Sequence, residues 1–225
     1  MPEPVTTTRR VLLSGATGLV GGQILQWLLD DPTVSQVHVL SRRALEVQHA
    51  KLQTHVVDFR QLPKMLPLDE VYLALGTTIR VAGSEEAFRA VDFDANLAVA
   101  KAGVAAGARR VALVSAVGAD ANSSVFYLRI KGELEQALGH LNLAALVIAQ
   151  PSLLLGDRDA LQQPPRLAEK LSTPLMKILA PLFPKRYRPI HARAVAQALV
   201  KTLPVASGTV VLQLEAMARI ASAEN

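Results

Sequence analysis

The sequence predicts an α/β fold built on one doubly wound parallel sheet. Short apolar segments rich in β-branched residues alternate with segments of helical periodicity along most of the chain. A glycine-rich turn follows the first apolar segment directly. Continuous apolar strands between helices indicate a sheet covered on both faces, which is typical of parallel sheets.

Each element is expected from its own apolar pattern, bounded by turn residues. The expected strands span residues 11–14, 37–40, 54–57, 71–75, 110–115, 144–149 and 209–213. The expected helices span residues 19–29, 85–106 (as one piece or two), 124–138 and 192–202. Parallel neighbours require crossover connections, which the intervening helices supply.

The chain is expected to form a single domain over residues 1–225, because its length suits one core and no linker or repeat interrupts it. Prolines break up the C-terminal portion, residues 151–225. We expect this portion to pack over the open end of the sheet as a short extension on the substrate side. Two interpretations stay open for its proline-rich part, which either shapes a substrate pocket or forms surface loop.

Composition excludes several kinds of site and partner. The chain has no cysteine, so thiolate metal sites and cysteine nucleophiles are excluded, and no metal is expected. The net charge of +5 comes from small scattered basic groups, so nucleic acid is not an expected partner. Residues 1–8 lack the apolar run of a signal peptide, and no segment reaches the roughly 20 apolar residues that span a bilayer. We therefore expect a cytoplasmic protein without membrane association.

The glycine-rich turn has the spacing of a dinucleotide-binding site. Gly15, Gly18 and Gly21 recur at every third position between the first strand and the first helix. They allow a tight turn, a close approach of backbone amides to a pyrophosphate, and close packing of the helix on the sheet. The fold is therefore predicted to be a Rossmann fold. The other predicted cofactor contacts in this turn are Thr17, Leu19 and Val20.

Two arginines follow the second strand, where NAD sites usually carry an acidic residue for the ribose 2′-hydroxyl. Arg42 and Arg43 occupy this position. A guanidinium group binds a 2′-phosphate through charge-assisted hydrogen bonds, whereas a carboxylate repels it. The sequence therefore predicts NADP(H) rather than NAD(H), and the alternative is a pair of solvated surface arginines.

The ends of the third and fourth strands are expected to line the cofactor, because ligands of such folds bind at the carboxyl ends of parallel strands. Asp58 and Phe59 follow the third strand and are predicted to flank the adenine. Leu75, Gly76 and Thr77 follow the fourth strand, where a glycine lets the backbone pass close to a ribose. A purely structural role stays open for both groups.

Three residues form a candidate catalytic group. Ser115 ends the fifth strand, and Tyr127 and Lys131 are four residues apart on the helix that follows. Side chains at this spacing share one helix face, where an ammonium group favours proton release from a neighbouring tyrosine. Ser115 is expected to hydrogen-bond the same oxygen and to polarise a substrate carbonyl.

With these motifs together, the chain resembles the short-chain dehydrogenase/reductase superfamily over nearly its whole length. More narrowly, it is similar to the atypical branch related to nucleoside-diphosphate-sugar epimerases, and to the subgroup containing the HIV Tat-interacting oxidoreductase. The resemblance implies that Ser115 and Tyr127 act on the substrate and that Tyr127 and Lys131 also contact the nicotinamide ribose. It further implies that Pro151 and Leu153 border the nicotinamide.

The chain departs from the superfamily pattern at one catalytic position. Typical members carry an asparagine in the helix after the fourth strand. Here either Asp92 or Asn96 takes that place, and the sequence does not decide between them. The C-terminal portion is also shorter than in sugar-nucleotide epimerases, which disfavours a bulky nucleotide-sugar substrate.

The predicted function is an NADP(H)-dependent oxidoreductase that transfers hydride to a small carbonyl substrate, with Tyr127 as proton donor. Two alternatives stay open. The first is a non-catalytic NADPH-binding regulator, and the second is a sugar-nucleotide epimerase or dehydratase. The intact group of Ser115, Tyr127 and Lys131 favours the enzyme. The expected partner is the small carbonyl substrate, and association as a homodimer is left open.

Overall fold

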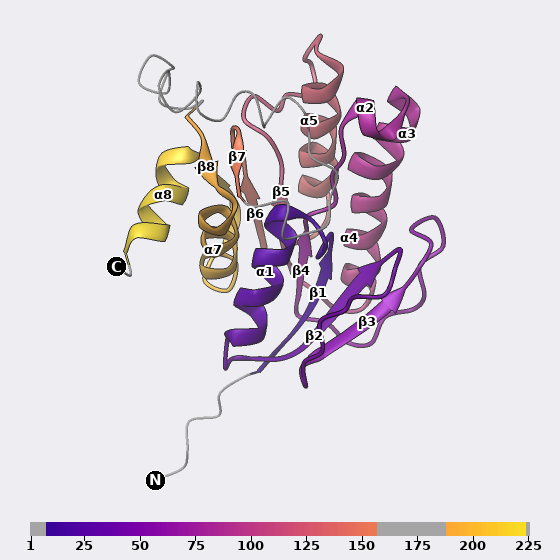
Figure 1. The fold of residues 1–225 in the computed structure, drawn as a ribbon, viewed down its shortest axis with the longest axis vertical. Helices are drawn as coiled ribbons and strands as arrows, with labels where there is room; N and C mark the ends of the chain where they lie inside the picture. The colour runs from indigo at the N-terminus through magenta and orange to yellow at the C-terminus, as the bar shows by residue number, and fades with distance from the viewer. Residues whose placement is uncertain (1–7, 157–187, 224–225) are drawn as a thin grey trace.

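The computed structural model describes residues 8–156 and 188–223, in which a seven-stranded sheet forms the centre (Figure 1). The strand order is β3-β2-β1-β4-β5-β6-β9, and all neighbours are parallel. The order reverses beside β1, so a crevice opens between β1 and β4 at their carboxyl ends. The strands are β1 (Arg9–Ser14), β2 (Val34–Ser41), β3 (Leu52–Val56), β4 (Glu70–Leu73), β5 (Arg110–Val114), β6 (Ala145–Ala149) and β9 (Gly208–Leu212).

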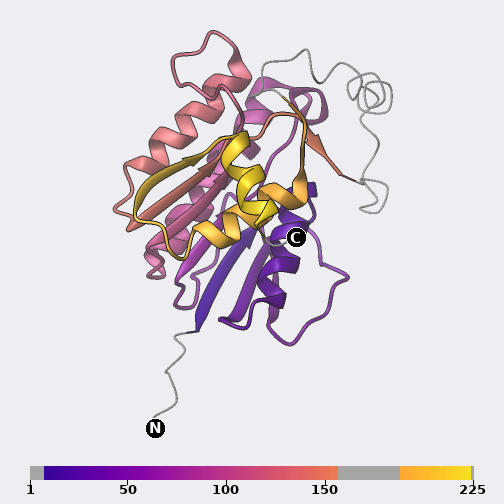
Figure 2. The same cartoon turned by 90° about the vertical axis from the view of Figure 1, so that its left-hand side faces the viewer.

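Helices cover both faces of the sheet, as Figures 1 and 2 show. One face carries α1 and α7, with α8 outside them, and the other carries α4 and α5. A short pair, β7 with β8, lies near the carboxyl ends of the strands. These remaining elements are α1 (Leu19–Asp30), α2 (Ile79–Ala82), α3 (Glu85–Arg89), η1 (Ala90–Ala95), α4 (Asn96–Ala105), α5 (Phe126–Gly139), β7 (Leu154–Leu155), β8 (Ile190–His191), α7 (Ala192–Thr202) and α8 (Leu214–Ser222).

The two faces of the sheet bury two separate apolar cores, because side chains alternate along each strand. In β1, Val11 and Leu13 lie in a core shared with α1 and α7. Leu12, between them, lies in the other core with residues of α4 and α5. The predicted α/β fold with a doubly wound parallel sheet is therefore confirmed.

The predicted helices and strands match the structure, except for elements whose apolar pattern in the sequence is too short or too weak to predict them. All seven strands are present with shifted ends, and the helix at 192–202 has its predicted bounds. The single turn of α2 was not predicted, since it has no apolar period and is defined by a cap at each end, Thr78 and Gly83. The two-residue strands β7 and β8 were not predicted, because a pair this short depends on tertiary contact. Helix α8, which buries one residue, Met217, was also not predicted.

The C-terminal portion takes a larger part in the main fold than we expected. Strand β9 pairs with β6 at the edge of the sheet, and α7 packs against α1. These described parts therefore complete the sheet and one core instead of only covering its open end. Residues 157–187, which contain five of the eight prolines of the C-terminal portion, lie outside the described residues. None of the described helices is long and apolar enough to cross a membrane.

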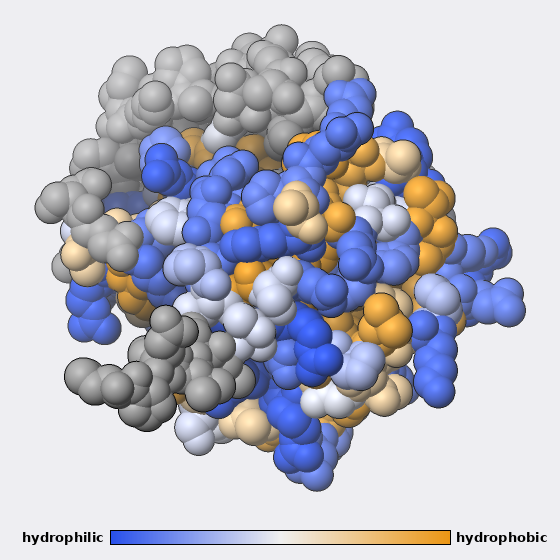
Figure 3. All heavy atoms as spheres, turned by 90° about the horizontal axis from the view of Figure 1, so that it is seen from below, coloured by the Kyte–Doolittle hydropathy of each residue, from blue (hydrophilic) through white to orange (hydrophobic). Residues whose placement is uncertain are grey.

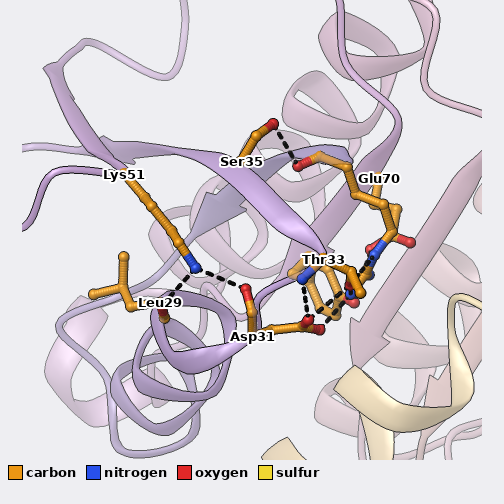
Figure 4. A network of polar contacts seen from close by, with 8 residues as sticks. Leu29, Asp31, Thr33, Ser35, Lys51 and Glu70 are labelled. Atoms are coloured by element: carbon orange, nitrogen blue, oxygen red, sulfur yellow. Dashed lines mark hydrogen bonds and ion pairs between the residues drawn. The ribbon is translucent and has the colours of Figure 1, made fainter. Parts of the chain in front are cut away.

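At the end of the sheet where the strands begin, hydrophilic residues surround smaller apolar areas (Figure 3). A polar network lies there, where β1, β2 and β4 begin (Figure 4). The guanidinium group of Arg9 donates to the buried Glu70 at 2.6 Å and to Asp31 at 2.5 Å. Tyr72 also donates to Glu70, at 3.0 Å, and burial beside this carboxylate raises the pKa of Tyr72. The amino group of Lys51 donates to the backbone carbonyl of Asp31 at 2.7 Å, near the end of α1.

We expect Arg9→Ala to lower the free energy of unfolding by about 2–3 kcal/mol, because it leaves the buried carboxylate of Glu70 without its cation. Urea unfolding at neutral pH measures the loss. Arg10→Ala is the matched control, since Arg10 and Asp69 are both about two-fifths exposed, at 39% and 40%. This exposed pair contributes roughly 0–1 kcal/mol. Equal losses in the two variants would contradict the importance of burial at Glu70.

Candidate active site

The glycine turn between β1 and α1 is closed by backbone contacts. Gly15 has a φ of +82°, and the amide of Gly18 donates to the carbonyl of Gly15 at 2.9 Å. A Cβ on Gly15 would lie 2.3 Å from the carbonyl oxygen of Ala74, just after β4. A Cβ on Gly21 would lie 2.0 Å from the carbonyl oxygen of Gly15. Glycine is therefore required at both positions by the close approach of backbone.

The first turn of α1 presents its amides toward the crevice. Gly18 is the N-cap of the helix and, as a glycine, has no side chain to cap the helix amides. Uncapped N–H groups at a helix start attract anions. The chain after β7 passes close to this turn, because a Cβ on Gly156 would lie 2.6 Å from the side chain of Leu19. Thr17, Leu19 and Val20 thus lie where the sequence placed the phosphate-binding turn.

The two arginines after β2 are exposed. The backbone amide of Arg43 donates to the hydroxyl of Ser41 at 3.3 Å. Within the described part of the chain, neither the Arg42 nor the Arg43 side chain forms an ion pair. Both guanidinium groups are therefore available to an anion at the carboxyl end of β2.

The two residues predicted to flank an adenine differ in their surroundings. The exposed carboxylate of Asp58 binds the guanidinium of Arg60 at 2.6 Å, and hydrogen bonds from Arg60 lower the pKa of Asp58 to about 2. Phe59 is partly buried and packs against the core that contains α4 and α5. Of the two residues predicted to flank an adenine, Asp58 is therefore already paired with a cation, and Phe59 also packs in the apolar core.

The segment after β4 is tied to the helix that follows it. The backbone amide of Thr77 donates to a carboxylate oxygen of Asp92 at 2.8 Å. The side-chain amide of Asn96 donates to the carbonyl of Leu75 at 3.1 Å. A Cβ on Gly76 would lie 3.6 Å from the carboxylate of Asp92. Asp92 and Asn96 thus both support this segment, and they do so through different groups.

Asp92 also holds the candidate catalytic lysine. The ammonium of Lys131 lies 2.7 Å from the carboxylate of Asp92, and the two side chains are 6% and 0% exposed. Asp92 belongs to η1, a π-helical segment between α3 and α4. Of the two residues proposed for the asparagine position, Asp92 is therefore the one that contacts Lys131. Tyr127, one turn before Lys131, is half-buried, with its ring 5.7 Å from that of Phe88.

Ser115 has a partner that the sequence did not suggest. Its hydroxyl donates to the carboxylate of Glu135, on α5. The side-chain amide of Gln150, just after β6, donates to both oxygens of the same carboxylate at 3.1 Å. Among the described residues, no hydrogen bond joins Ser115 to Tyr127.

The surroundings of Glu135 shift the pKa of its carboxyl group. Burial raises the pKa of Glu135, and the hydrogen bonds from Ser115 and Gln150, together with the charge of Lys131, oppose this rise. Sequence reasoning missed Glu135, although a signal was present. Glu135 lies four residues after Lys131 and eight after Tyr127, on neighbouring positions of one helix face.

The segment after β6 runs beside the end of β5. Pro151 is buried, and its carbonyl accepts a hydrogen bond from the amide of Val117 at 2.9 Å. The carbonyl of Leu153 accepts a hydrogen bond from the amide of Ile190 at 3.0 Å. The neighbouring hydroxyl of Ser152 donates to the carbonyl of Arg188.

The structure thus brings Lys131 together with Asp92, and Ser115 with Glu135, at the carboxyl ends of neighbouring strands. Arg42, Arg43 and Asp58 lie at the ends of β2 and β3, on the other side of β1. Exposed arginines therefore lie on one side of the glycine turn, and the Lys131–Asp92 and Ser115–Glu135 pairs lie on the other. This arrangement can bind an extended anionic ligand and move protons at one end of it.

Solved structures with the same fold include NAD-binding proteins. MoeE5 in complex with UDP-glucose and NAD superposes with a TM-score of 0.67, at 15% identity, over 95% of this chain and 81% of that one. A short chain dehydrogenase family protein from Francisella tularensis superposes with a TM-score of 0.68, at 14% identity, over 94% and 99%. These similarities establish a Rossmann-like fold for the chain.

Sequence relatives come from fungi. The protein fmp52, mitochondrial, of Emericella nidulans is 38% identical over 159 residues, which cover 66% of this chain and 68% of that one. The protein FMP52-1, mitochondrial, of Scheffersomyces stipitis is 34% identical over 171 residues, which cover 73% and 74%. The cytoplasmic location expected from the sequence is wrong by this comparison, since the relatives carry mitochondrial names.

A family model settles the classification of the chain. The model of the HIM1 family matches residues 35–183, which contain the arginines after β2 and the whole candidate catalytic group. The identity to the FMP52 proteins extends over two thirds or more of both chains. The chain belongs to the HIM1 family.

Proposed function

We propose that the chain is an NADP(H)-dependent oxidoreductase that acts on a small carbonyl substrate. The observation that carries this proposal is the position of the Lys131–Asp92 ion pair. This buried pair lies one helical turn from Tyr127 and is tied through Thr77 to the strand beside the glycine turn. The resemblance to the subgroup of the HIV Tat-interacting oxidoreductase, which rests on the motifs around Ser115, Tyr127 and Lys131, belongs to the proposal.

The glycine turn fits a dinucleotide. A Cβ on Gly18 would lie 3.2 Å from the carbonyl oxygen of Gly15, which is a tight contact even for a methyl group, so glycine suits this position. These amides and Thr17 would hold the pyrophosphate, and Arg42 and Arg43 would hold a 2′-phosphate. Tyr127, Lys131 and the segment from Pro151 to Leu153 would border the nicotinamide end.

The proposed reaction converts a carbonyl compound, NADPH and a proton into an alcohol and NADP⁺. When bound, the nicotinamide supplies the hydride for the carbonyl carbon. Tyr127 gives its phenolic proton to the carbonyl oxygen and is reprotonated from solvent. Ser115 would hydrogen-bond the same carbonyl oxygen and polarise it. Lys131 stabilises the tyrosinate that this transfer leaves, and Asp92 holds Lys131 in place.

Oxidation of NADPH with benzaldehyde, cyclohexanone and menadione tests the proposed reaction. We expect turnover with at least one of these carbonyls and a loss of about 100-fold or more in kcat with Tyr127→Phe, since general acid catalysis contributes about this much. Turnover that is insensitive to this substitution would refute the mechanism. Tight binding of NADPH without turnover of any of the three would favour the non-catalytic regulator.

Comparison of NADPH with NADH tests the cofactor assignment. We expect the Arg42→Ala/Arg43→Ala double variant to bind NADPH more weakly by about 100-fold or more, because it removes two charge-assisted hydrogen bonds that each contribute about 1.5–3 kcal/mol. The affinity for NADH is the internal control and should not change. Calorimetric titration gives both dissociation constants. Equal affinities of the unaltered protein for the two nucleotides would exclude the assignment.

A further inference from the structure

Helix α5 carries a carboxylate that the proposed mechanism does not use. Glu135 follows Tyr127 and Lys131 at four-residue spacing, on the side of the helix that meets the ends of β5 and β6. Its carboxylate accepts hydrogen bonds from Ser115, after β5, and Gln150, after β6. These bonds join Glu135 to a serine that the proposed function places at the substrate oxygen.

The bond between Ser115 and Glu135 limits what the serine can do. A hydroxyl group has one proton to donate and two lone pairs that accept. The ionised carboxylate of Glu135 can only accept hydrogen bonds, so the Ser115 hydroxyl directs its one proton toward that carboxylate. In that state Ser115 offers lone pairs to a ligand. A carbonyl oxygen also offers only lone pairs, so it cannot form a hydrogen bond with the Ser115 oxygen in that state.

We propose that Glu135 is a positioning residue whose protonation state sets whether Ser115 accepts or donates a hydrogen bond at the substrate oxygen. With Glu135 ionised, Ser115 matches the hydroxyl of an alcohol. With Glu135 protonated, the new O–H donates to Ser115, and the serine proton is free for a carbonyl oxygen. The other carboxyl oxygen of Glu135 still accepts from Gln150. The proposal rests on the proposed function, which places a substrate oxygen at Ser115.

The surroundings of Glu135 shift its ionisation to a higher pH than that of an ordinary glutamate. Burial raises its pKa from the ordinary range of a glutamate. Lys131, on the same helix, opposes this rise, and its charge is partly neutralised by the ion pair with Asp92 from η1. The ends of β5 and β6 contribute the neutral groups of Ser115 and Gln150.

Carbon-13 NMR of labelled glutamate carboxyl groups tests the bond in the full chain without cofactor or substrate. The signal of Glu135 is assigned by its loss in Glu135→Gln. We expect Ser115→Ala to raise the pKa of Glu135, because the variant removes a hydrogen bond that favours the ionised form. An unchanged titration of Glu135 in Ser115→Ala would overturn the proposal, whatever the activity of the protein.

The pH profile of carbonyl reduction tests the effect on the substrate, with whichever of benzaldehyde, cyclohexanone and menadione is turned over. In the unaltered protein, we expect kcat/KM to fall as Glu135 ionises. Glu135→Gln should remove this fall, because the amide N–H donates to Ser115 at every pH while its oxygen accepts from Gln150. Glu133→Gln, which removes a carboxylate of α5 that pairs with Arg89 and Arg129, should retain the profile of the unaltered protein.

These readouts separate the two proposals. A Glu135→Gln variant that keeps the original pH profile would overturn the role of Glu135 while the oxidoreductase assignment stands. A purely structural role would lower activity at all pH values and leave the shape of the profile unchanged, which also overturns the proposal. If none of the three carbonyls is turned over, the oxidoreductase assignment fails, and the NMR titration alone decides whether Ser115 and Glu135 are coupled.

Discussion

Replacement of Asp92 by alanine is expected to lower the free energy of unfolding by about 3–5 kcal/mol, because it leaves a buried ammonium without its partner. The Lys131 side chain is 6% exposed and its partner carboxylate is fully buried. The same substitution also removes the acceptor of the Thr77 amide, 2.8 Å away. Urea unfolding at neutral pH measures the loss.

Asp94→Ala is the matched control for Asp92→Ala, since Asp94 lies in the same segment and is exposed. We expect its effect to stay within about 0.5 kcal/mol. A double variant, Asp92→Ala/Lys131→Met, removes both charges and should regain much of the lost stability. If the double variant is no more stable than Asp92→Ala, the unpaired charge is not the cause of the loss.

Gly21→Ala is expected to have the other large effect, because its Cβ would overlap the backbone carbonyl group of Gly15. The Cβ would lie 2.0 Å from the carbonyl oxygen of Gly15 and 2.6 Å from its carbonyl carbon. Neither atom is a flexible side-chain end, so α1 must move away from the turn. We expect a loss of about 3 kcal/mol or more in the free energy of unfolding, at the upper end for overpacked sites. Nucleotide binding should fall with it.

Gly139→Ala provides the comparison for this substitution. Gly139 is the last residue of α5, and a Cβ there would meet no atom within 4 Å. Alanine in an unobstructed helical position should stabilise the protein by up to about 1 kcal/mol. Thermal unfolding of the two variants side by side gives the contrast. Similar midpoints would show that the close contact at Gly21 relaxes easily.

The features that the sequence predicted well are those encoded by local pattern. The glycine spacing between β1 and α1 depends on a few neighbouring residues, and so does the apolar pattern of each strand. The strands and the strand–turn–helix unit that these patterns predict are present in the structure. The positions of Ser115, Tyr127 and Lys131 also followed from local spacing. Their roles stay predictions.

The partners of these residues were beyond sequence reasoning, because they depend on how distant elements meet. Lys131 pairs with Asp92, 39 residues earlier, through a π-helical segment whose presence no apolar period reveals. Ser115 meets Glu135 because β5 ends beside α5. The pairing of Arg9 with Glu70 likewise requires that β1 and β4 be neighbours in the sheet.

The π-helical segment has a consequence for which changes of chain length the protein tolerates. A π turn contains one more residue than an α turn over the same path. Here the segment lies between the Thr77 amide, which binds Asp92, and the core residues Val99 and Ala100 of α4. Loss of one residue from 90–95 would turn either the carboxylate or the apolar face away from its partner. Because this segment is fixed in register at both ends, we expect it not to tolerate the loss of a residue.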